Sequence, residues 1–190
     1  MEKAVNKIDS TEALSNPRFI KPIKINYTQS GKKKVWEAVI SHDSVAVLLW
    51  HRDKDAFVLV KQLRATVLNK NKIDGDMYEL CAGIVDKKAT NIQIAKEEVL
   101  EECGYDVALQ NIETISSFYT SVGISGTHQT LYYAEIDDSM RIDEGGGLEE
   151  EEIEVIYIPT SESKEFMFDL NYQKTTGVML SIYWFFDTKT

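Results

Sequence analysis

Residues 83–105 read GIVDKKATNIQIAKEEVLEECGY, and most of what can be inferred about the chain starts from this segment. Thr90 and Gln93 have the spacing of a capping box, in which the two residues satisfy each other's free backbone donors at the start of a helix. Gly104 suits the left-handed turn that ends one. The apolar positions at helical spacing are Ile92, Ala95, Val99 and Cys103. The pattern therefore predicts a helix over residues 90–103 with one buried stripe.

Three glutamates share one face of this predicted helix. Glu98 lies three residues before Glu101 and four before Glu102, and side chains at these spacings are neighbours on a helix surface. Like charges so placed repel each other and cost stability unless a cation lies among them. Oxygen-only ligands suit a hard cation such as Mg²⁺, with Mn²⁺ as the second choice. The competing interpretation is a solvated acidic face, the commoner meaning of a bare acidic cluster.

A second acidic run at residues 149–152 follows the glycines at 145–147, which predict a flexible loop. It immediately precedes a segment at 153–158 that predicts a strand, and a strand end can hold a carboxylate at a fixed place opposite the helix. Two acidic clusters on rigid elements suggest a site for more than one metal ion. A solvated loop is the alternative.

The rest of the chain is predicted as strands around the helix. We expect strands at residues 19–27, 35–41, 45–50, 57–63, 78–81, 112–119, 130–136 and 153–158, a polar loop at 65–76 and a closing helix at 174–186. This order indicates an α/β fold in which helices cover a mixed sheet.

Length, charge and cysteine content narrow the class of protein. The chain has 190 residues, with 21 Lys and Arg against 31 Asp and Glu, for a net charge of −10. The acidic balance argues against nucleic-acid binding, which needs a basic face. Cys81 and Cys103 can build neither a disulfide framework nor a four-ligand zinc site, so we expect reduced thiols in the cytoplasm. The longest apolar run, at 177–186, is about half of the ~20 residues that a membrane span needs, so no membrane association is expected.

The segment at 83–105 resembles the Nudix box. That box reads Gly, five residues, Glu, seven residues, then Arg-Glu-apolar-x-Glu-Glu-x-Gly-apolar, and this chain keeps Gly83 and the whole of residues 98–105. Ala89 stands where the box has its first Glu, and Glu97 stands where it has Arg. In the family the Glu assists the site from its margin and the Arg braces the helix. The replacements at residues 89 and 97 therefore affect the expected reaction rate and number of metal ions, and leave the principal metal ligands of the box in place.

The resemblance covers roughly residues 18–187. Residues 58–64 and 78–83 are similar to the strands before the box in nucleoside-diphosphate-sugar and ADP-ribose diphosphatases. Residues 121–130, residues 145–148 and Trp36 are most similar to the UDP-sugar diphosphatase branch, whereas ADP-ribose enzymes usually have a Pro where this chain has Ser-Val-Gly. The resemblance implies a Nudix α/β/α sandwich over residues 42–190. It also implies an N-terminal antiparallel β extension over 18–41 that helps form a homodimer. The polar residues before it predict a flexible leader over 1–17.

The resemblance also implies site residues. The implied metal ligands are the carbonyl of Ala82 and the carboxylates of Glu98, Glu102 and Glu151. The implied catalytic carboxylates are Glu101, which supports the ligands, and Glu149 and Glu151, whose register stays open by one residue. Arg64 would contact the diphosphate and Glu79 would orient the substrate or a metal-bound water. Trp36 would stack on the nucleobase, either within one chain or across a dimer interface, with core packing as an equal alternative.

These inferences predict a Mg²⁺-dependent hydrolase that cleaves UDP-sugars, with UDP-glucose giving UMP and glucose 1-phosphate. One alternative is an ADP-ribose diphosphatase that gives AMP and ribose 5-phosphate. Another is a non-catalytic module that binds nucleotide sugars with a degraded box, which Ala89 and Glu97 motivate. Neither residue spacing nor composition ranks the carboxylates as general base.

Overall fold

The computed structural model describes residues 6–72, 74–148 and 151–189. The strands are β1 Lys21–Gln29, β2 Lys32–Ile40, β3 Ser44–His51, β4 Ala56–Leu63, β5 Asp76–Glu79, β6 Cys81–Ile84, β7 Ile112–Thr120, β8 Thr127–Ile136 and β9 Ile153–Pro159. The α-helices are α1 Ala65–Asn71, α2 Asn91–Cys103, α3 Ser163–Phe168 and α4 Thr176–Thr188, with short 3₁₀ turns at Leu109–Asn111 and Asp138–Met140.

A seven-stranded mixed sheet forms the body of the molecule. Its strands run in the order β5-β4-β3-β8-β7, with β6 pairing with β3 and β9 with β4. The β3–β8 pair is parallel and the other pairs are antiparallel. The α/β class with a mixed sheet is therefore confirmed. Among the described helices, none is long and apolar enough to cross a membrane.

Both faces of the sheet are covered, which explains why β3 and β4 are apolar almost throughout. Val45, Val47 and Leu49 of β3 belong to one core, which the buried stripe of α2 completes. Ala46 and Leu48 belong to a second core, which α3 and α4 close from the opposite side. A strand buried on both faces needs apolar residues at every position rather than at alternate ones.

Helix α2 begins and ends as its sequence predicts. The Thr90 backbone N–H donates to Gln93 Oε1 at 2.9 Å, so the capping box is present, and Gly104 ends the helix at φ 76°. Ile92 is only partly buried, whereas Ile94 is fully buried in the stripe. The helix therefore turns its apolar face slightly away from the predicted one.

Two predictions about local structure were wrong. The polar segment at 65–76 contains helix α1, because Leu68 is buried and packs where Gly75 leaves no side chain in the way. The single strand expected at 78–81 is two strands, because the chain passes at Leu80 from pairing with β4 to pairing with β3. Helix α3 was not predicted from the sequence.

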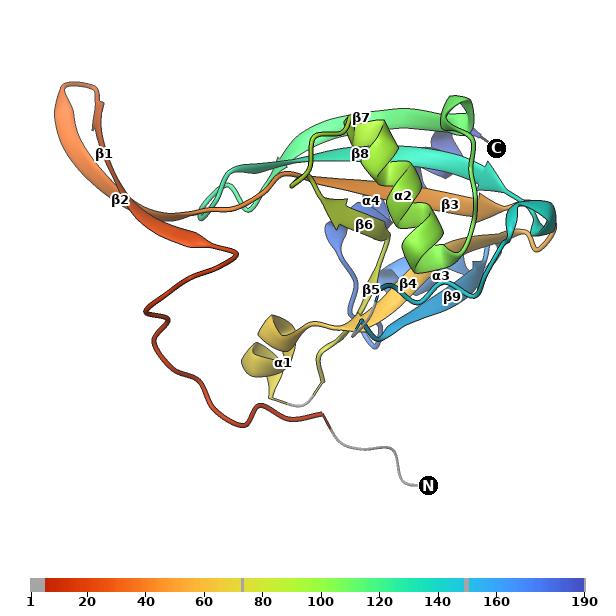
Figure 1. The fold of residues 1–190 in the computed structure, drawn as a ribbon, viewed down its shortest axis with the longest axis horizontal. Coiled ribbons are helices and arrows are strands. Elements are labelled where there is room, and N and C mark those ends of the chain that lie inside the picture. The colour runs from red at the N-terminus through yellow and green to blue at the C-terminus, as the bar shows by residue number, and fades with distance from the viewer. Residues whose placement is uncertain (1–5, 73, 149–150, 190) are drawn as a thin grey trace.

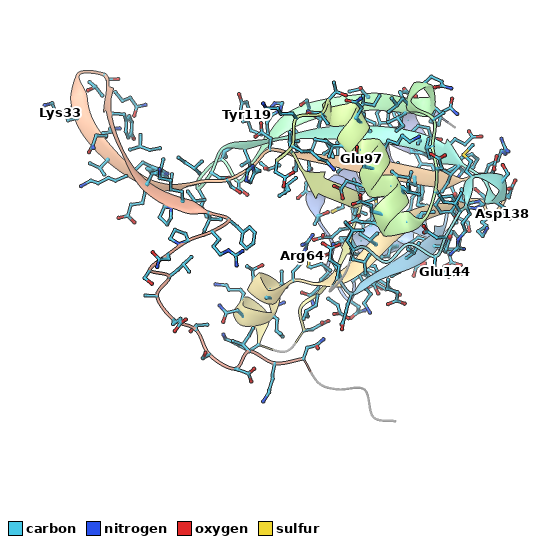
Figure 2. All side chains as sticks on the ribbon, in the orientation of Figure 1. Lys33, Arg64, Glu97, Tyr119, Asp138 and Glu144 are labelled. Atoms are coloured by element: carbon cyan, nitrogen blue, oxygen red, sulfur yellow. The ribbon has the colours of Figure 1, made fainter. Side chains whose placement is uncertain are left out.

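Strands β1 and β2 form a separate two-stranded sheet that projects from the body (Figure 1). Two hydrogen bonds join it to the β7–β8 loop, from the Val39 N–H to the Ile124 carbonyl and from Trp36 Nε1 to the Gly123 carbonyl. Figure 2 shows Lys33 at the outer part of this hairpin, far from Asp138 and Glu144 at the other end of the molecule.

Candidate active site

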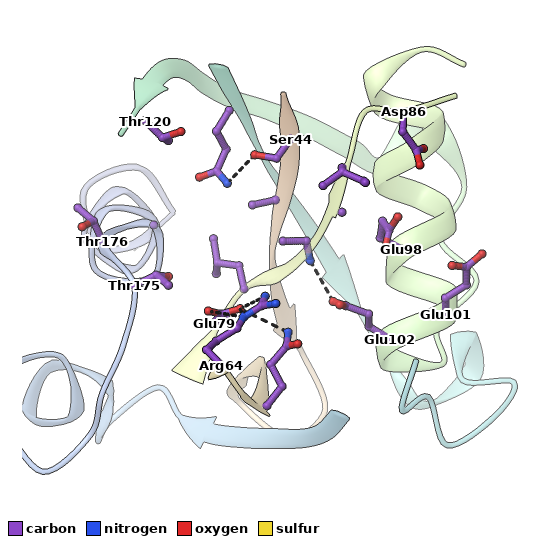
Figure 3. A pocket seen from close by; sticks show the side chains of 18 of the residues that line it. Ser44, Arg64, Glu79, Asp86, Glu98, Glu101, Glu102, Thr120, Thr175 and Thr176 are labelled. Carbon is purple, nitrogen blue, oxygen red and sulfur yellow. Dashed lines mark hydrogen bonds and ion pairs between the residues drawn. The ribbon is translucent and has the colours of Figure 1, made fainter. Parts of the chain in front are cut away.

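A cleft of about 990 Å³ lies beside β6, between helix α2 and the N-terminal end of α4 (Figure 3). Helix α2 contributes three carboxylates to one side, and Arg64 and Glu79 lie at its base. The side near α4 carries the hydroxyls of Thr175 and Thr176. Acidic, basic and uncharged polar groups thus face one space.

Gly83 lets the first glutamate of the helix approach the sheet. A Cβ on this residue would lie 2.0 Å from Glu98 Oε1 and 2.1 Å from its carboxyl carbon. Any other side chain at residue 83 must therefore displace the carboxylate of Glu98. The close approach of β6 to α2, rather than a turn, is the reason for glycine at this place in the sequence.

Glu102 is held in place by the backbone of the same strand. Its Oε2 accepts a hydrogen bond from the Ala82 N–H at 3.0 Å, and the residue is only 6 % exposed. The N–H of Ala82 thus holds the carboxylate of Glu102. The carbonyl of Ala82, which is the other predicted ligand group here, belongs to the same short strand, β6. The predicted ligands Ala82, Glu98 and Glu102 are together at one end of the cleft.

The surroundings of these carboxylates disfavour their charged forms. Burial raises the pKa of Glu98 to about 7, and the charges of Glu101 and Glu151 act in the same direction. Burial also raises the pKa of Glu102 to about 7, although the hydrogen bond from Ala82 opposes this change. Carboxylates that repel one another in a partly buried place are what a bound cation would relieve.

The loop that carries the second acidic run is attached to the end of α2. The N–H groups of Gly146 and Gly147 donate to the carbonyls of Glu102 and Glu101, at 2.9 and 3.1 Å. All three glycines at 145–147 have positive φ, and a Cβ on Gly145 would lie 2.4 Å from the Glu102 carbonyl oxygen. Where the sequence predicted a flexible loop, glycine instead lets the backbone cap the helix closely.

Glu151 reaches the cleft from this loop. Its Oε2 accepts a hydrogen bond from the Leu148 N–H at 3.0 Å, and the side chain is exposed. Glu149, the other predicted catalytic carboxylate of this loop, lies outside the described residues. Glu151, two residues before β9, lines the same cleft as Glu98 and Glu102.

Arg64, the residue between β4 and α1, forms an ion pair with Glu79 at the end of β5. Arg64 Nε lies 3.2 and 3.1 Å from the two carboxylate oxygens of Glu79, whose side chain is 11 % exposed. Burial opposes the charge of Arg64, but the hydrogen bonds and charge of Glu79 raise its pKa further. Glu79 therefore holds the guanidinium of Arg64 at the base of the cleft, where Figure 3 shows the two side chains paired.

Trp36 is the one predicted site residue with a described position outside the cleft lining. It lies on β2 with 52 % of its surface exposed, and its Nε1 donates to the Gly123 carbonyl at 3.0 Å. It is not packed in the core, so the alternative of core packing does not hold within this chain.

The sequence interpretation missed other residues of the cleft. Lys87 lines it next to the helix glutamates, and Ser44 and Gln129 line it beneath α4. Ser44 and Gln129 are 85 residues apart and are neighbours only because β3 pairs with β8. No local motif marks such a pair.

The donor set fits a hard divalent cation in its chemistry. Ala82, Glu98, Glu102 and Glu151 offer oxygen atoms alone, which Mg²⁺ and Mn²⁺ prefer. The described side chains do not by themselves form a ready-made cluster of three or more His, Cys, Asp or Glu ligands. The fit thus rests on donor type, proximity to one cleft and the raised pKa values of two carboxylates.

Comparisons with known proteins find close relatives. The chain is 34 % identical over 196 residues to the uridine diphosphate glucose pyrophosphatase NUDT14 of Bos taurus, with 88 % of each chain covered. It is 44 % identical over 124 residues to a GDP-mannose pyrophosphatase of Cronobacter sakazakii, covering 65 % of this chain and 63 % of that one. No family model matches the chain.

The fold has a counterpart among solved structures. The crystal structure of an ADP compounds hydrolase superposes with a TM-score of 0.69 over 98 % of both chains, at 14 % sequence identity. This match confirms the α/β/α architecture and its antiparallel N-terminal extension as a known fold.

Proposed function

The chain belongs to the Nudix hydrolase family, and from this membership we propose that it is a divalent-metal-dependent diphosphatase of nucleoside diphosphate sugars. The proposed substrate class is UDP-sugars, with UDP-glucose and water giving UMP and glucose 1-phosphate. The observation that carries the proposal is a single cleft in which the carboxylates of Glu98 and Glu102 face the same space as the paired guanidinium of Arg64. An anionic diphosphate needs both a cation site and a fixed positive charge.

The names of the relatives support the substrate class. The UDP-glucose pyrophosphatases of cattle and mouse match 88 % of this chain, at 34 % and 33 % identity. The GDP-mannose pyrophosphatase matches a smaller share of the chain, although at higher identity. We therefore place UDP-glucose first and treat GDP-mannose and ADP-ribose as competing substrates.

The residues that would hold the metal are Glu98, Glu102 and Glu151, with the carbonyl of Ala82. A divalent cation, Mg²⁺ or Mn²⁺, would supply charge neutralisation at the diphosphate and a more acidic water. Arg64 would bind the diphosphate, since Glu79 holds the guanidinium in one orientation. Two charged groups that fix each other need little reorganisation when an anion arrives.

A carboxylate at the cleft would accept the proton of the attacking water. Glu151 could take this role in place of that of a metal ligand, because the Leu148 N–H engages only one carboxylate oxygen, Oε2, and the residue is exposed. Glu101 lines the same cleft and is the second candidate. Glu149 remains a predicted candidate on sequence grounds alone.

We further propose that the enzyme is a homodimer that uses the projecting hairpin. Residues 18–41 hold six basic residues and one acidic residue, whereas the rest of the chain holds 15 and 30. The hairpin also exposes apolar side chains, including Val35, Trp36 and Ile40, each at 52 %. A lone two-stranded hairpin is marginally stable in water. A second copy offers an acidic surface to cover it, and it would place Trp36 where the ring can stack on a nucleobase.

The buried free thiols of Cys81 and Cys103 support the cytoplasm, a reducing compartment, as the location of the protein.

The experiment that tests the proposed function measures kcat/KM with Mg²⁺ for UDP-glucose, GDP-mannose, ADP-ribose and ADP-glucose, with products identified. We expect UMP and glucose 1-phosphate at the highest kcat/KM. Preference for ADP-ribose would replace the substrate assignment. Binding of UDP-glucose without turnover would favour the non-catalytic module, and full turnover in excess EDTA would overturn the metal requirement.

A further inference from the structure

The cleft has two chemically different sides. Charged residues gather on the side of α2 and at the base, as described above. The side beneath α4 is lined by uncharged residues, among them Ser44, Ala46, Leu80, Gln129, Thr175, Thr176 and Gly177. A substrate with an anionic centre and a neutral, hydroxyl-rich end would match this division.

Gln129 is the one amide side chain on this uncharged side, and its orientation is fixed. Ser44 and Gln129 face each other across the parallel β3–β8 pair, and Gln129 Nε2 donates to Ser44 Oγ at 3.1 Å. The Oε1 atom points toward the start of α4, since a Cβ built on Gly177 would lie 3.7 Å from it. Among the described residues, none donates a hydrogen bond to this oxygen. Gln129 therefore presents a held acceptor and a spare N–H to the cleft.

Short side chains leave room beside this amide. Ala46 and Ala82 face each other across β3 and β6, and Gly177 opens the wall of α4. Ala82 also donates its N–H to Glu102, so this space lies directly next to the carboxylate side of the cleft. A ring placed here would be the group attached to the diphosphate itself. A nucleobase is separated from the diphosphate by a pentose.

We propose that Gln129, oriented by Ser44, is a specificity-determining residue that binds the hydroxyls of the hexose in the nucleotide-sugar substrate. This inference rests on the proposed function and adds the residue that distinguishes one sugar from another. A hydroxyl both donates and accepts, and one amide supplies the matching acceptor and donor. Thr175 and Thr176 add hydroxyls on the same side without adding charge.

The test compares Gln129→Leu with wild type on UDP-glucose and on its C4 epimer, UDP-galactose. Gln110→Leu is the matched control, because Gln110 is exposed in the 3₁₀ turn after α2 and does not line the cleft. Loss of a neutral hydrogen bond predicts a fall in kcat/KM for UDP-glucose of about tenfold in Gln129→Leu, with the preference between the epimers largely lost. Ser44→Ala should lower the preference less, because it frees the amide without removing it.

Inhibition by UMP separates the hexose from the ribose of the nucleoside. We expect the UMP inhibition constant of Gln129→Leu to stay within about twofold of wild type, since UMP lacks the hexose. A parallel weakening of UMP inhibition would overturn the hexose assignment, and so would an unchanged epimer preference. Gln129→Asn, which keeps the amide, covers the case in which Gln129→Leu fails to fold.

Failure of the proposed function has a different signature. If wild type binds UDP-glucose without cleaving it, the proposed hydrolysis fails. Calorimetry then still tests the subsite, because it compares the affinities of wild type and Gln129→Leu for the two epimers. If wild type cleaves UDP-glucose and Gln129→Leu behaves like Gln110→Leu, the subsite falls and the hydrolase stands.

Discussion

The ammonium group of Lys87 forms an ion pair with the carboxylate of Glu97, joining the β6–α2 loop to the first half of helix α2. The hydrogen bond to Glu97 raises the pKa of Lys87, and the charges of Glu101 and Glu98 act in the same direction. This pair occupies the region in which the chain departs from the Nudix box. The box has an acid at residue 89 and a base at residue 97, whereas this chain has Ala89, a base in the loop and an acid on the helix. Lys87, two residues before Ala89, thus supplies the cation that pairs with Glu97 and joins the loop to the helix.

Exchange of the two charges tests this brace. Lys87→Glu alone places a carboxylate near those of Glu97, Glu98 and Glu101. It should lower the melting temperature, because neighbouring like charges repel. The pair is exposed by 43 % and 46 %, so its coupling should be small, about 0.2–1 kcal/mol. Lys87→Glu with Glu97→Lys should recover the loss in a double-mutant cycle of thermal unfolding. Equal melting temperatures for the single and double variants would show that the pair contributes nothing.

Removal of charge from the proposed metal ligands should lower kcat strongly and leave the fold intact. Glu98→Gln and Glu102→Gln keep shape but remove the negative charge that a cation needs. We expect kcat to fall by more than the about 10–100-fold typical of losing an outer-shell partner of a metal ligand. Circular dichroism confirms folding, and titration of Mn²⁺ measures the lost affinity. Glu97→Gln, on the same helix but paired with Lys87, is the control. Wild-type rates in either ligand variant would refute the assignment.

Acid should stabilise the metal-free protein across one pH window. The pKa values of Glu98 and Glu102 rise from 4.5 to about 7 on folding. Between these values the folded protein keeps protons that the unfolded chain has lost, so the contribution of these groups to stability falls as pH rises from about 4.5 to 7. We expect the effect to be on the order of 2 kcal/mol, because Glu98 is only partly buried.

Thermal unfolding in EDTA, compared between pH 5.5 and pH 8, measures this effect. Mg²⁺ should raise the melting temperature more at pH 8, where the carboxylates are ionised and bind the cation. Glu98→Gln should remove part of the pH dependence. The same Mg²⁺ shift at both pH values would contradict the linkage.

The guanidinium of Arg64 should matter for substrate binding more than for stability. Arg64→Lys keeps the charge but loses the planar fork that Glu79 orients. We expect KM for UDP-glucose to rise by about tenfold or more, the cost of a hydrogen bond to a charged group. Glu79→Gln should raise KM less, since it releases the guanidinium without removing it. Unchanged steady-state kinetics in Arg64→Lys would remove this residue from the site.

A charge on the exposed apolar side of the hairpin should dissociate the proposed dimer. Val35→Asp places an anion where a second copy would cover apolar surface, and Val35 is 52 % exposed in the single chain. Light scattering after gel filtration should show half the wild-type mass. Thr28→Asp is the control. Thr28 is exposed on β1, and this substitution removes no large apolar side chain from the hairpin. A wild-type mass equal to one chain would end the dimer proposal.

The sequence alone could predict features that depend on residues close together in the chain. The capping box at Thr90 and Gln93, the stop at Gly104 and the shared face of Glu98, Glu101 and Glu102 all depend on residues at most four apart. Helix geometry alone relates such residues, so the shared acidic face of the helix could be predicted without knowing what packs against it. The family resemblance then supplied roles for Arg64 and Glu79, which stay predictions, while the structure shows that the two side chains form an ion pair.

Contacts between distant segments could not be read from the order of residues. The polar segment that became α1, the break at Leu80 and the pairing of Ser44 with Gln129 each depend on which strand lies beside which. The glycines at 145–147 looked like a flexible linker, and they cap the end of α2. Periodicity reports only that a segment is buried. The partner that buries it, and therefore the shape of the cleft, follows from packing the whole sheet between its helices.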